Sequence, residues 1–231
     1  MSINERDRKE PGRVTLDQLK RDAEVQALMT GGDQLLGAMG FTEHGARHAG
    51  WVSAVAFNVL TRLGFAERDA ELAGMAGFLH DVGNVAGRHN HEQAGALLAR
   101  EVLLRLGMPY EEISLVMGAI GNHEEDVGQV VSNVGAALML ADKSDVHRSR
   151  VRSQDKAGFD IHDRVNYAVE HSFLRVDEHR KTITLELKID TTISPVMEYF
   201  EIFLTRMSLC RRAALFLGAQ FELDVNNTRL L

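Results

Sequence analysis

Residues 77–83 read Gly-Phe-Leu-His-Asp-Val-Gly, and they form the most informative stretch of the chain. His80 and Asp81 follow an apolar helical segment and precede a glycine, so both side chains can bind one metal ion. Histidine and aspartate are good ligands for borderline and hard divalent cations. A His-Asp dipeptide is common in proteins. Its significance here depends on the other histidines and aspartates, which are spaced along the neighbouring helices.

The composition is that of an ordinary globular protein: 231 residues, 45% apolar and 26% charged. A net charge of −7 argues against long nucleic acids and anionic membranes as partners. Cys210 is the only cysteine, which excludes an intramolecular disulfide and a cysteine-rich zinc site and suits a reducing compartment. Residues 1–13 lack the apolar segment of a secretory signal, and no run reaches the roughly 18 apolar residues that span a bilayer. We therefore expect a cytoplasmic protein.

Apolar residues recur with helical spacing from Leu16 to about Val146, and glycines interrupt the pattern. We expect a mainly α fold with a charged mobile arm (1–14), a helical domain (15–172) and a small α+β unit (173–231). The first helix is predicted to begin at Leu16 and to end near Gly31-Gly32. Further helices are predicted over residues 47–63, 67–79, 92–106, 110–120 and 130–141.

The C-terminal segment has a different pattern. Residues 182–189 alternate strictly between apolar and polar, which predicts a half-buried strand. Ser194-Pro195 is typical of a helix start, and this helix should run to about Leu217. Residues 221–225 alternate again and complete a strand-helix-strand appendage. Because two or three strands alone are marginally stable, we expect the sheet to pack on the helical domain or on another subunit.

Six histidine and aspartate side chains fall at or near the ends of separate predicted helices. They are His48, His80, Asp81, His91, His123 and Asp142. Helix bundles commonly build metal sites in this way. The alternative interpretation is hydrogen bonding at helix ends, or stabilisation of helix dipoles in the case of His91 and His123. The other histidines, His44 and His89 among them, are expected at the surface or beside the ligands.

Over roughly residues 40–150 the sequence resembles the HD-domain superfamily of metal-dependent phosphohydrolases. The family pattern is a His, then His-Asp, then a distant Asp, and it is matched by His48, His80-Asp81 and Asp142. The blocks HDVGN, HEQAG and ADKSD look like the family's segments, in the family's order. The resemblance implies an HD-type helical bundle.

Two further histidines hold a second metal in many members of that superfamily, and His91 and His123 match their positions. Asn122 stands where a double histidine is frequent, so that extra donor is missing. The Gly-Tyr-Pro motif of the cyclic-di-GMP-cleaving branch does not occur in this chain.

The expected cofactor is a divalent transition metal, one ion or two. Histidine and carboxylate without thiolate suit Mn, Fe, Co, Ni or Zn, and the sequence does not choose among them. Asp81 is the expected bridge, and we assign it a catalytic role. Paired ions about 3.5–4 Å apart can clamp the attacking and leaving oxygens and convert a bridging water into hydroxide. With four ligands, a single ion could do the same.

Basic residues near Asp142 are candidates for binding substrate phosphate. Lys143 follows this ligand directly and is assigned both a catalytic and a substrate-binding role. Arg148 and Arg150, with Arg152 beyond them, form a basic stretch that suits bidentate contacts with phosphate. The alternative is a solvated basic segment. Arg47, beside His48, is a weaker candidate.

The leading functional hypothesis is hydrolysis of phosphomonoesters or phosphodiesters by a metal-bound hydroxide. The expected partner is a small phosphorylated substrate, a nucleotide in the first place. One alternative is a di-iron oxygenase that uses the same ligands. Another is a non-catalytic ligand sensor whose pocket controls the C-terminal unit. A homodimer remains an open alternative.

Overall fold

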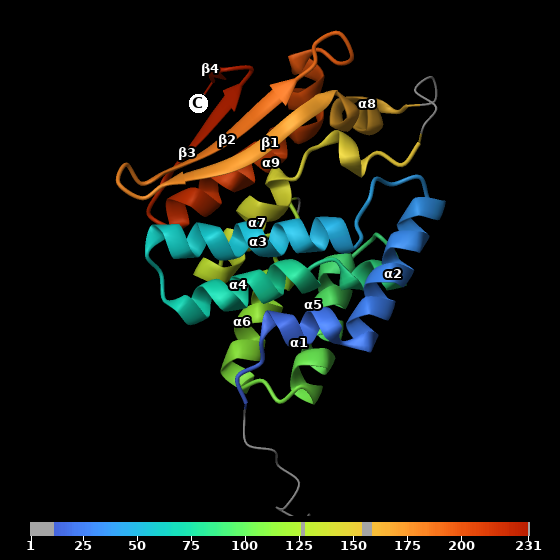
Figure 1. Cartoon of the computed structure of the whole chain (residues 1–231), viewed down its shortest axis with the longest axis vertical. Coiled ribbons are helices and arrows are strands. Elements are labelled where there is room, and N and C mark those ends of the chain that lie inside the picture. The colour runs from blue at the N-terminus through green and yellow to red at the C-terminus, as the bar shows by residue number, and fades with distance from the viewer. Residues whose placement is uncertain (1–11, 126–127, 154–158, 231) are drawn as a thin grey trace, which may run out of the picture.

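The computed structural model describes residues 12–125, 128–153 and 159–230. Its helical part is a bundle that occupies most of the molecule, and a small sheet covers one end (Figure 1). Residues 1–11 of the expected mobile arm lie outside the described residues, whereas Val14 is buried. The elements of the helical part are α1 (Leu16–Arg21), α2 (Ala23–Ala38), α3 (Ala46–Leu63), α4 (Glu67–Leu79), the 3-10 helix η2 (Val82–Ala86), α5 (His91–Arg105), α6 (Tyr110–Gly121), α7 (Asn133–Ser144), the 3-10 helix η3 (Arg148–Arg150) and α8 (Ile161–Ala168).

Most of the predicted helices are confirmed. The bounds of α3, α4, α5 and α6 agree with the prediction to within one residue at each end. Helix α7 begins three residues later than predicted, because the Ser132 side chain caps it by accepting a hydrogen bond from the Gly135 amide at 3.0 Å. Helix α8 was not predicted.

The predicted end of the first helix at Gly31-Gly32 is wrong. The chain breaks earlier, at Asp22, whose carboxylate accepts hydrogen bonds from two amides of the next helix. Helix α2 then continues through both glycines. A Cβ at Gly32 would lie 3.1 Å from the backbone nitrogen of Val85. These glycines therefore serve the close approach of α2 to η2, the segment that follows His80-Asp81.

The C-terminal unit contains the predicted strand-helix-strand, now β2 (Thr182–Ile189), α9 (Val196–Phe216) and β3 (Gln220–Val225). Two strands were not predicted, β1 (Val169–Asp177) and β4 (Thr228–Arg229). The sheet order is β1-β2-β3-β4, with β2 parallel to β3 and both outer pairs antiparallel. The predicted mainly α class is confirmed, and the four-stranded sheet means that the chain is not all-α.

Strand β1 lacks a clear alternation, because Val169 and Leu174 are its only buried residues. The expected domain boundary between residues 172 and 173 falls inside this strand. The sheet was expected to pack on the helical domain or on another subunit, and in the structure it packs on the helical domain. Helix α9 packs against α7, β1 contacts α3, and one apolar cluster runs through both parts of the chain. None of the helices in the described part of the chain has the length and apolar character needed to cross a bilayer.

Two glycines hold α5 against the turn that follows α4. A Cβ at Gly83 would lie 1.9 Å from the carbonyl oxygen of His91 and 2.4 Å from the amide nitrogen of Gly95. A Cβ at Gly95 would lie 3.1 Å from the carbonyl oxygen of His80. This backbone contact brings the first turn of α5 beside the His80-Asp81 pair.

Candidate metal centre

All six residues predicted as metal ligands lie together in the structure, although they come from five helices. His48 lies in the first turn of α3, His80 and Asp81 follow α4, His91 begins α5, His123 follows α6, and Asp142 lies near the end of α7. Each of these residues is buried, and Asp142 is the most exposed at 9%. The ends of these helices therefore meet at one buried centre.

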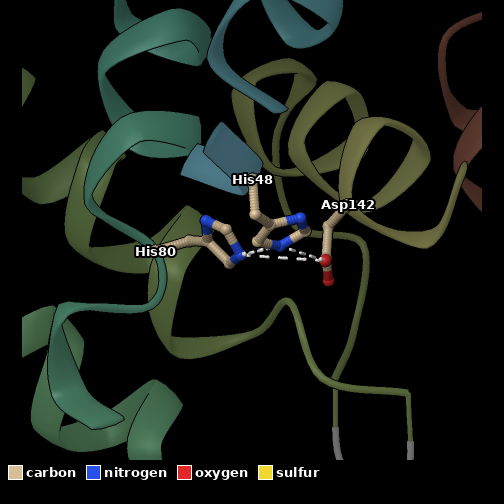
Figure 2. Close-up of side chains that lie close together, drawn as sticks. All are labelled: His48, His80 and Asp142. Atoms are coloured by element: carbon tan, nitrogen blue, oxygen red, sulfur yellow. Dashed lines mark hydrogen bonds and ion pairs between the residues drawn. The ribbon is translucent and has the colours of Figure 1, made fainter. Parts of the chain in front are cut away.

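The first donor cluster consists of His48, His80, Asp142 and one oxygen of Asp81. The Nε2 atom of His48 lies 3.3 Å from His80 Nε2 and 3.4 Å from Asp142 Oδ1. His80 Nε2 lies 3.3 Å from Asp81 Oδ2. Figure 2 shows the two imidazole rings and the Asp142 carboxylate facing one another. Four donor atoms thus surround one small volume.

The second donor cluster consists of His91, His123, Glu124 and the other oxygen of Asp81. His91 Nε2 lies 3.2 Å from His123 Nε2, 3.4 Å from Asp81 Oδ1 and 3.5 Å from Glu124 Oε2. Asp81 therefore belongs to both clusters, with one oxygen directed to each.

The four histidines of the centre share one tautomer. Each ring donates a hydrogen bond from Nδ1 to an oxygen that only accepts, so in the neutral ring Nε2 carries the lone pair. The acceptors are Asp145 Oδ2 for His48 at 2.6 Å, and the carbonyl oxygens of Gly77 for His80 at 2.8 Å, Arg88 for His91 at 3.1 Å and Ile120 for His123 at 2.6 Å. Four lone pairs converge, which is the arrangement that metal-binding histidines adopt.

The geometry of both clusters fits divalent cations. Ligand atoms about 2.0–2.2 Å from one ion lie about 3.0–3.6 Å from one another, and the separations given above fall in this range. Asp81 Oδ2 is buried and accepts no hydrogen bond from any residue that the structure describes. An unpaired buried oxygen is costly, and a cation between the donors would satisfy it.

The carboxylates of the first donor cluster also favour a cation. Burial opposes the protonated form of His80, but Asp81 and Asp142 raise its pKa to about 9. His123 faces the opposite balance, because burial together with His80 and Lys143 lowers its pKa to about 3. Burial disfavours the ionised form of Asp81, yet His80 and His91 hold the pKa of that carboxyl well below its usual range.

A family model for the HD domain matches residues 45–147. Residues 45–147 are an HD domain. Such domains are generally metal-dependent hydrolases that bind divalent metals. The match contains both donor clusters and leaves the C-terminal unit outside. No curated protein matches the chain with significant similarity.

Asp145 fixes the orientation of His48 within the HD domain. Its Oδ2 atom accepts the Nδ1 proton of His48 at 2.6 Å and a hydrogen bond from Arg47 at 2.7 Å. Burial disfavours its charge, but His48, Arg150 and Arg47 keep the pKa of the Asp145 carboxyl well below its usual range. Arg47, predicted to bind substrate, thus contacts the carboxylate that orients a metal donor.

Replacing Asp145 with asparagine should weaken metal binding by about 10- to 100-fold, as is typical when the partner of a metal-binding histidine is lost. An asparagine amide keeps the shape but not the charge that orients the His48 ring. Equilibrium dialysis with Mn²⁺ would measure the effect, and Asp17→Asn on exposed α1 is the matched control. Unchanged Mn²⁺ affinity in Asp145→Asn would contradict the assignment.

The Lys143 ammonium is buried against carboxylates of the centre and does not project into solvent. Its Nζ atom lies 2.8 Å from Asp142 Oδ2 and 2.5 Å from Glu125 Oε2. Burial lowers the pKa of this amine, but Asp142, Glu124 and Glu125 together raise it above the ordinary value. Lys143 is therefore a charged residue that forms an ion pair with Asp142 Oδ2, while Asp142 Oδ1 faces His48.

The predicted basic stretch divides between two places. Arg150 is buried and donates to the carbonyl oxygens of Asp145 and Glu43, each at 2.9 Å. Arg148 lies over the ring of Tyr167, with its guanidinium carbon 5.5 Å from the ring centre. Among the described residues, Arg150 lines the cavity beside the metal centre, whereas Arg148 and Arg47 do not.

This cavity has a volume of about 370 Å³ and lies beside the metal centre. Arg88, Arg150 and Arg206 line its walls, and Phe41 and Phe203 add apolar surface. Arg206 and Phe203 belong to α9, and the Arg206 guanidinium lies 4.3 Å from the centre of the Phe203 ring. The C-terminal unit therefore supplies part of the wall. The volume is within the usual range of sites for small molecules, roughly 300–1,000 Å³.

Four residues of this region were not assigned from the sequence: Arg88, Glu124, Asp145 and Arg206. A local signal existed for two of them, because Glu124 directly follows His123 and Asp145 lies in the same block as Asp142. His44, expected at the surface or beside the ligands, lines the cavity with its ring 5.6 Å from that of His48.

Proposed function

We propose that this protein hydrolyses phosphate esters of a small molecule, a nucleotide in the first place, with divalent metal ions held by the HD domain. One observation carries the proposal. Two donor clusters share Asp81 beside a cavity whose walls contain three arginines. Metal ions in such clusters would supply charge neutralisation and an acidified water, which phosphate ester hydrolysis requires.

Arginines beside the centre could bind an anionic substrate, although the same cavity is also lined by Glu124, Glu125, Asp160 and Asp163. Arg88 and Arg206 both line the cavity and also a small neighbouring pocket that Asp81 and Asp142 line. Guanidinium groups bind phosphate oxygens through paired N–H donors, so these two side chains would orient the phosphate beside the ions. Lys143 keeps Asp142 in place through its ion pair and would not need to touch the substrate.

The apolar surface of the cavity suits a flat group attached to the phosphate. Phe41 and Phe203 lie in its walls, and His162 and Asn166 of α8 offer polar edges. Aromatic rings stack on planar groups while polar side chains fix their orientation. A nucleotide base has this combination of flat apolar faces and polar edges, which is why a nucleotide is the favoured substrate.

The test is hydrolysis by metal-free protein reloaded with Mn²⁺, Co²⁺ or Fe²⁺. The panel would contain nucleoside monophosphates, cyclic nucleotides, dinucleotides and p-nitrophenyl esters, with products separated by chromatography. We expect metal-dependent hydrolysis of at least one nucleotide, abolished by a chelator and restored by added metal. Oxygen consumption that requires reduced iron, with no hydrolysis of any ester, would instead favour the oxygenase alternative and contradict the proposal.

A further inference from the structure

The side chain of Arg88 lies inside the second donor cluster. Its Nη1 atom is 3.1 Å from His91 Nε2 and 3.9 Å from Asp81 Oδ1, and its Nη2 atom is 3.5 Å from Glu124 Oε2. Three of the four donors of this cluster thus face the guanidinium group. The first donor cluster has no such contact with an arginine among the described residues.

Arg88 and a metal ion cannot both use His91. The Nδ1 proton of His91 is donated to the carbonyl oxygen of Arg88 at 3.1 Å, which leaves a single lone pair on Nε2. That lone pair either accepts a hydrogen bond from the guanidinium or binds a metal ion. The positively charged guanidinium would also repel a divalent ion within hydrogen-bonding distance of His91.

The Arg88 side chain borders two cavities into which it could turn. It lines the 370 Å³ cavity and also a second cavity of about 390 Å³ beside the start of α5. Gly87 has φ 127° and Asn90 has φ 56°, so two turns in the backbone set this short segment apart from η2 and α5. The two cavities beside Arg88 give the guanidinium space to turn away from His91.

We propose that Arg88 is a resident cation of the second donor cluster, which it occupies while only the first cluster holds an ion. A second ion must displace the guanidinium, so Arg88 weakens the binding of this ion and sets the concentration at which the centre holds two. The displaced guanidinium turns toward the cavity, where a substrate phosphate would lie. This inference rests on the metal centre of the proposed function.

The test is calorimetric titration of the metal-free full-length chain with Mn²⁺, in the wild type and in Arg88→Gln. We expect the second Mn²⁺ to bind at least about tenfold more tightly in Arg88→Gln, because one positive charge and one competing hydrogen bond are removed. The first Mn²⁺ should bind equally well in both proteins. Arg88→Met, which keeps the apolar stem, should show the same gain. Arg100→Gln, at a side chain of α5 that is 42% exposed, changes the net charge equally and should show none.

The outcomes separate the inference from the proposed function. If neither protein binds any Mn²⁺, the metal centre itself is refuted. The role of Arg88 is overturned if the wild type and Arg88→Gln bind the second ion with equal affinity. It is also overturned if Arg88→Gln and Arg88→Met both bind the second ion more weakly than the wild type does. In either case, equal binding of the first ion shows that the metal centre stands. If Arg100→Gln gained the same affinity for the second Mn²⁺, the change in net charge alone would explain the effect. That result would also overturn the role of Arg88.

Discussion

Replacing Asp81 with asparagine should reduce the metal content at saturating Mn²⁺ from two ions per chain to one or none, and should lower hydrolysis by at least about 1,000-fold. The two carboxylate oxygens face different donor clusters, Oδ2 near His80 and Oδ1 near His91. An asparagine offers one neutral oxygen and an NH₂ group that does not bind metal. One well-placed electrostatic contact is commonly worth about 10²–10³ in rate, and this side chain serves two clusters.

Elemental analysis of protein dialysed against saturating Mn²⁺, corrected for the metal in the dialysis buffer, and the rate on the best substrate of the panel would measure both effects. Asp17→Asn on α1 is the control for the loss of one carboxylate, and it should retain both ions and full activity. Two bound ions in Asp81→Asn would show that this carboxylate does not join the clusters. Full activity in the variant would exclude a catalytic role for Asp81.

Replacing Gly83 with alanine should lower the free energy of unfolding by about 3 kcal/mol or more, at the upper end of what overpacking usually costs. The new methyl group would lie 1.9 Å from the His91 carbonyl oxygen and 2.4 Å from the Gly95 amide nitrogen. Both are backbone atoms, so no side chain can rotate away. Helix α5 must shift as a whole, and His91 must move away from His123 and Asp81.

Urea denaturation of the metal-free protein would measure this loss, and Mn²⁺ titration would measure the accompanying loss at the second donor cluster. Gly118→Ala in α6 is the matched control, because its Cβ would meet no atom within 4 Å. Alanine in a helix is favoured over glycine by roughly 0.5–1 kcal/mol, so this variant should be as stable as the wild type or more so. If Gly83→Ala were equally stable, the close contact between α5 and the turn after α4 would be wrong.

The helices that carry the centre could be predicted because their apolar spacing is regular and glycines or caps mark their ends. Helix α4 is an example, with acidic residues in its first turn and His80 as its C-cap. Ligands placed at helix ends are visible in the sequence for the same reason. Strand β1 could not be found in this way, because its two buried residues lie five positions apart.

The Gly31-Gly32 pair shows where local patterns fail. Two glycines in succession normally weaken a helix, and only the close approach of Val85 explains why the helix continues through them. Arg88 and Arg206 are a similar case. Each lies three residues from a neighbour that it contacts, His91 for Arg88 and Phe203 for Arg206. No local pattern places Arg206 beside the metal centre, because α9 comes near it by packing against α7.

We propose that this chain holds two metal ions in two donor clusters that share Asp81. The most direct measurement is the anomalous diffraction of crystals grown with millimolar Mn²⁺, collected at the manganese edge. We expect two peaks, one among His48, His80 and Asp142 and one among His91, His123 and Glu124, with Asp81 contacting both. A peak in one cluster alone, or in neither, would contradict it.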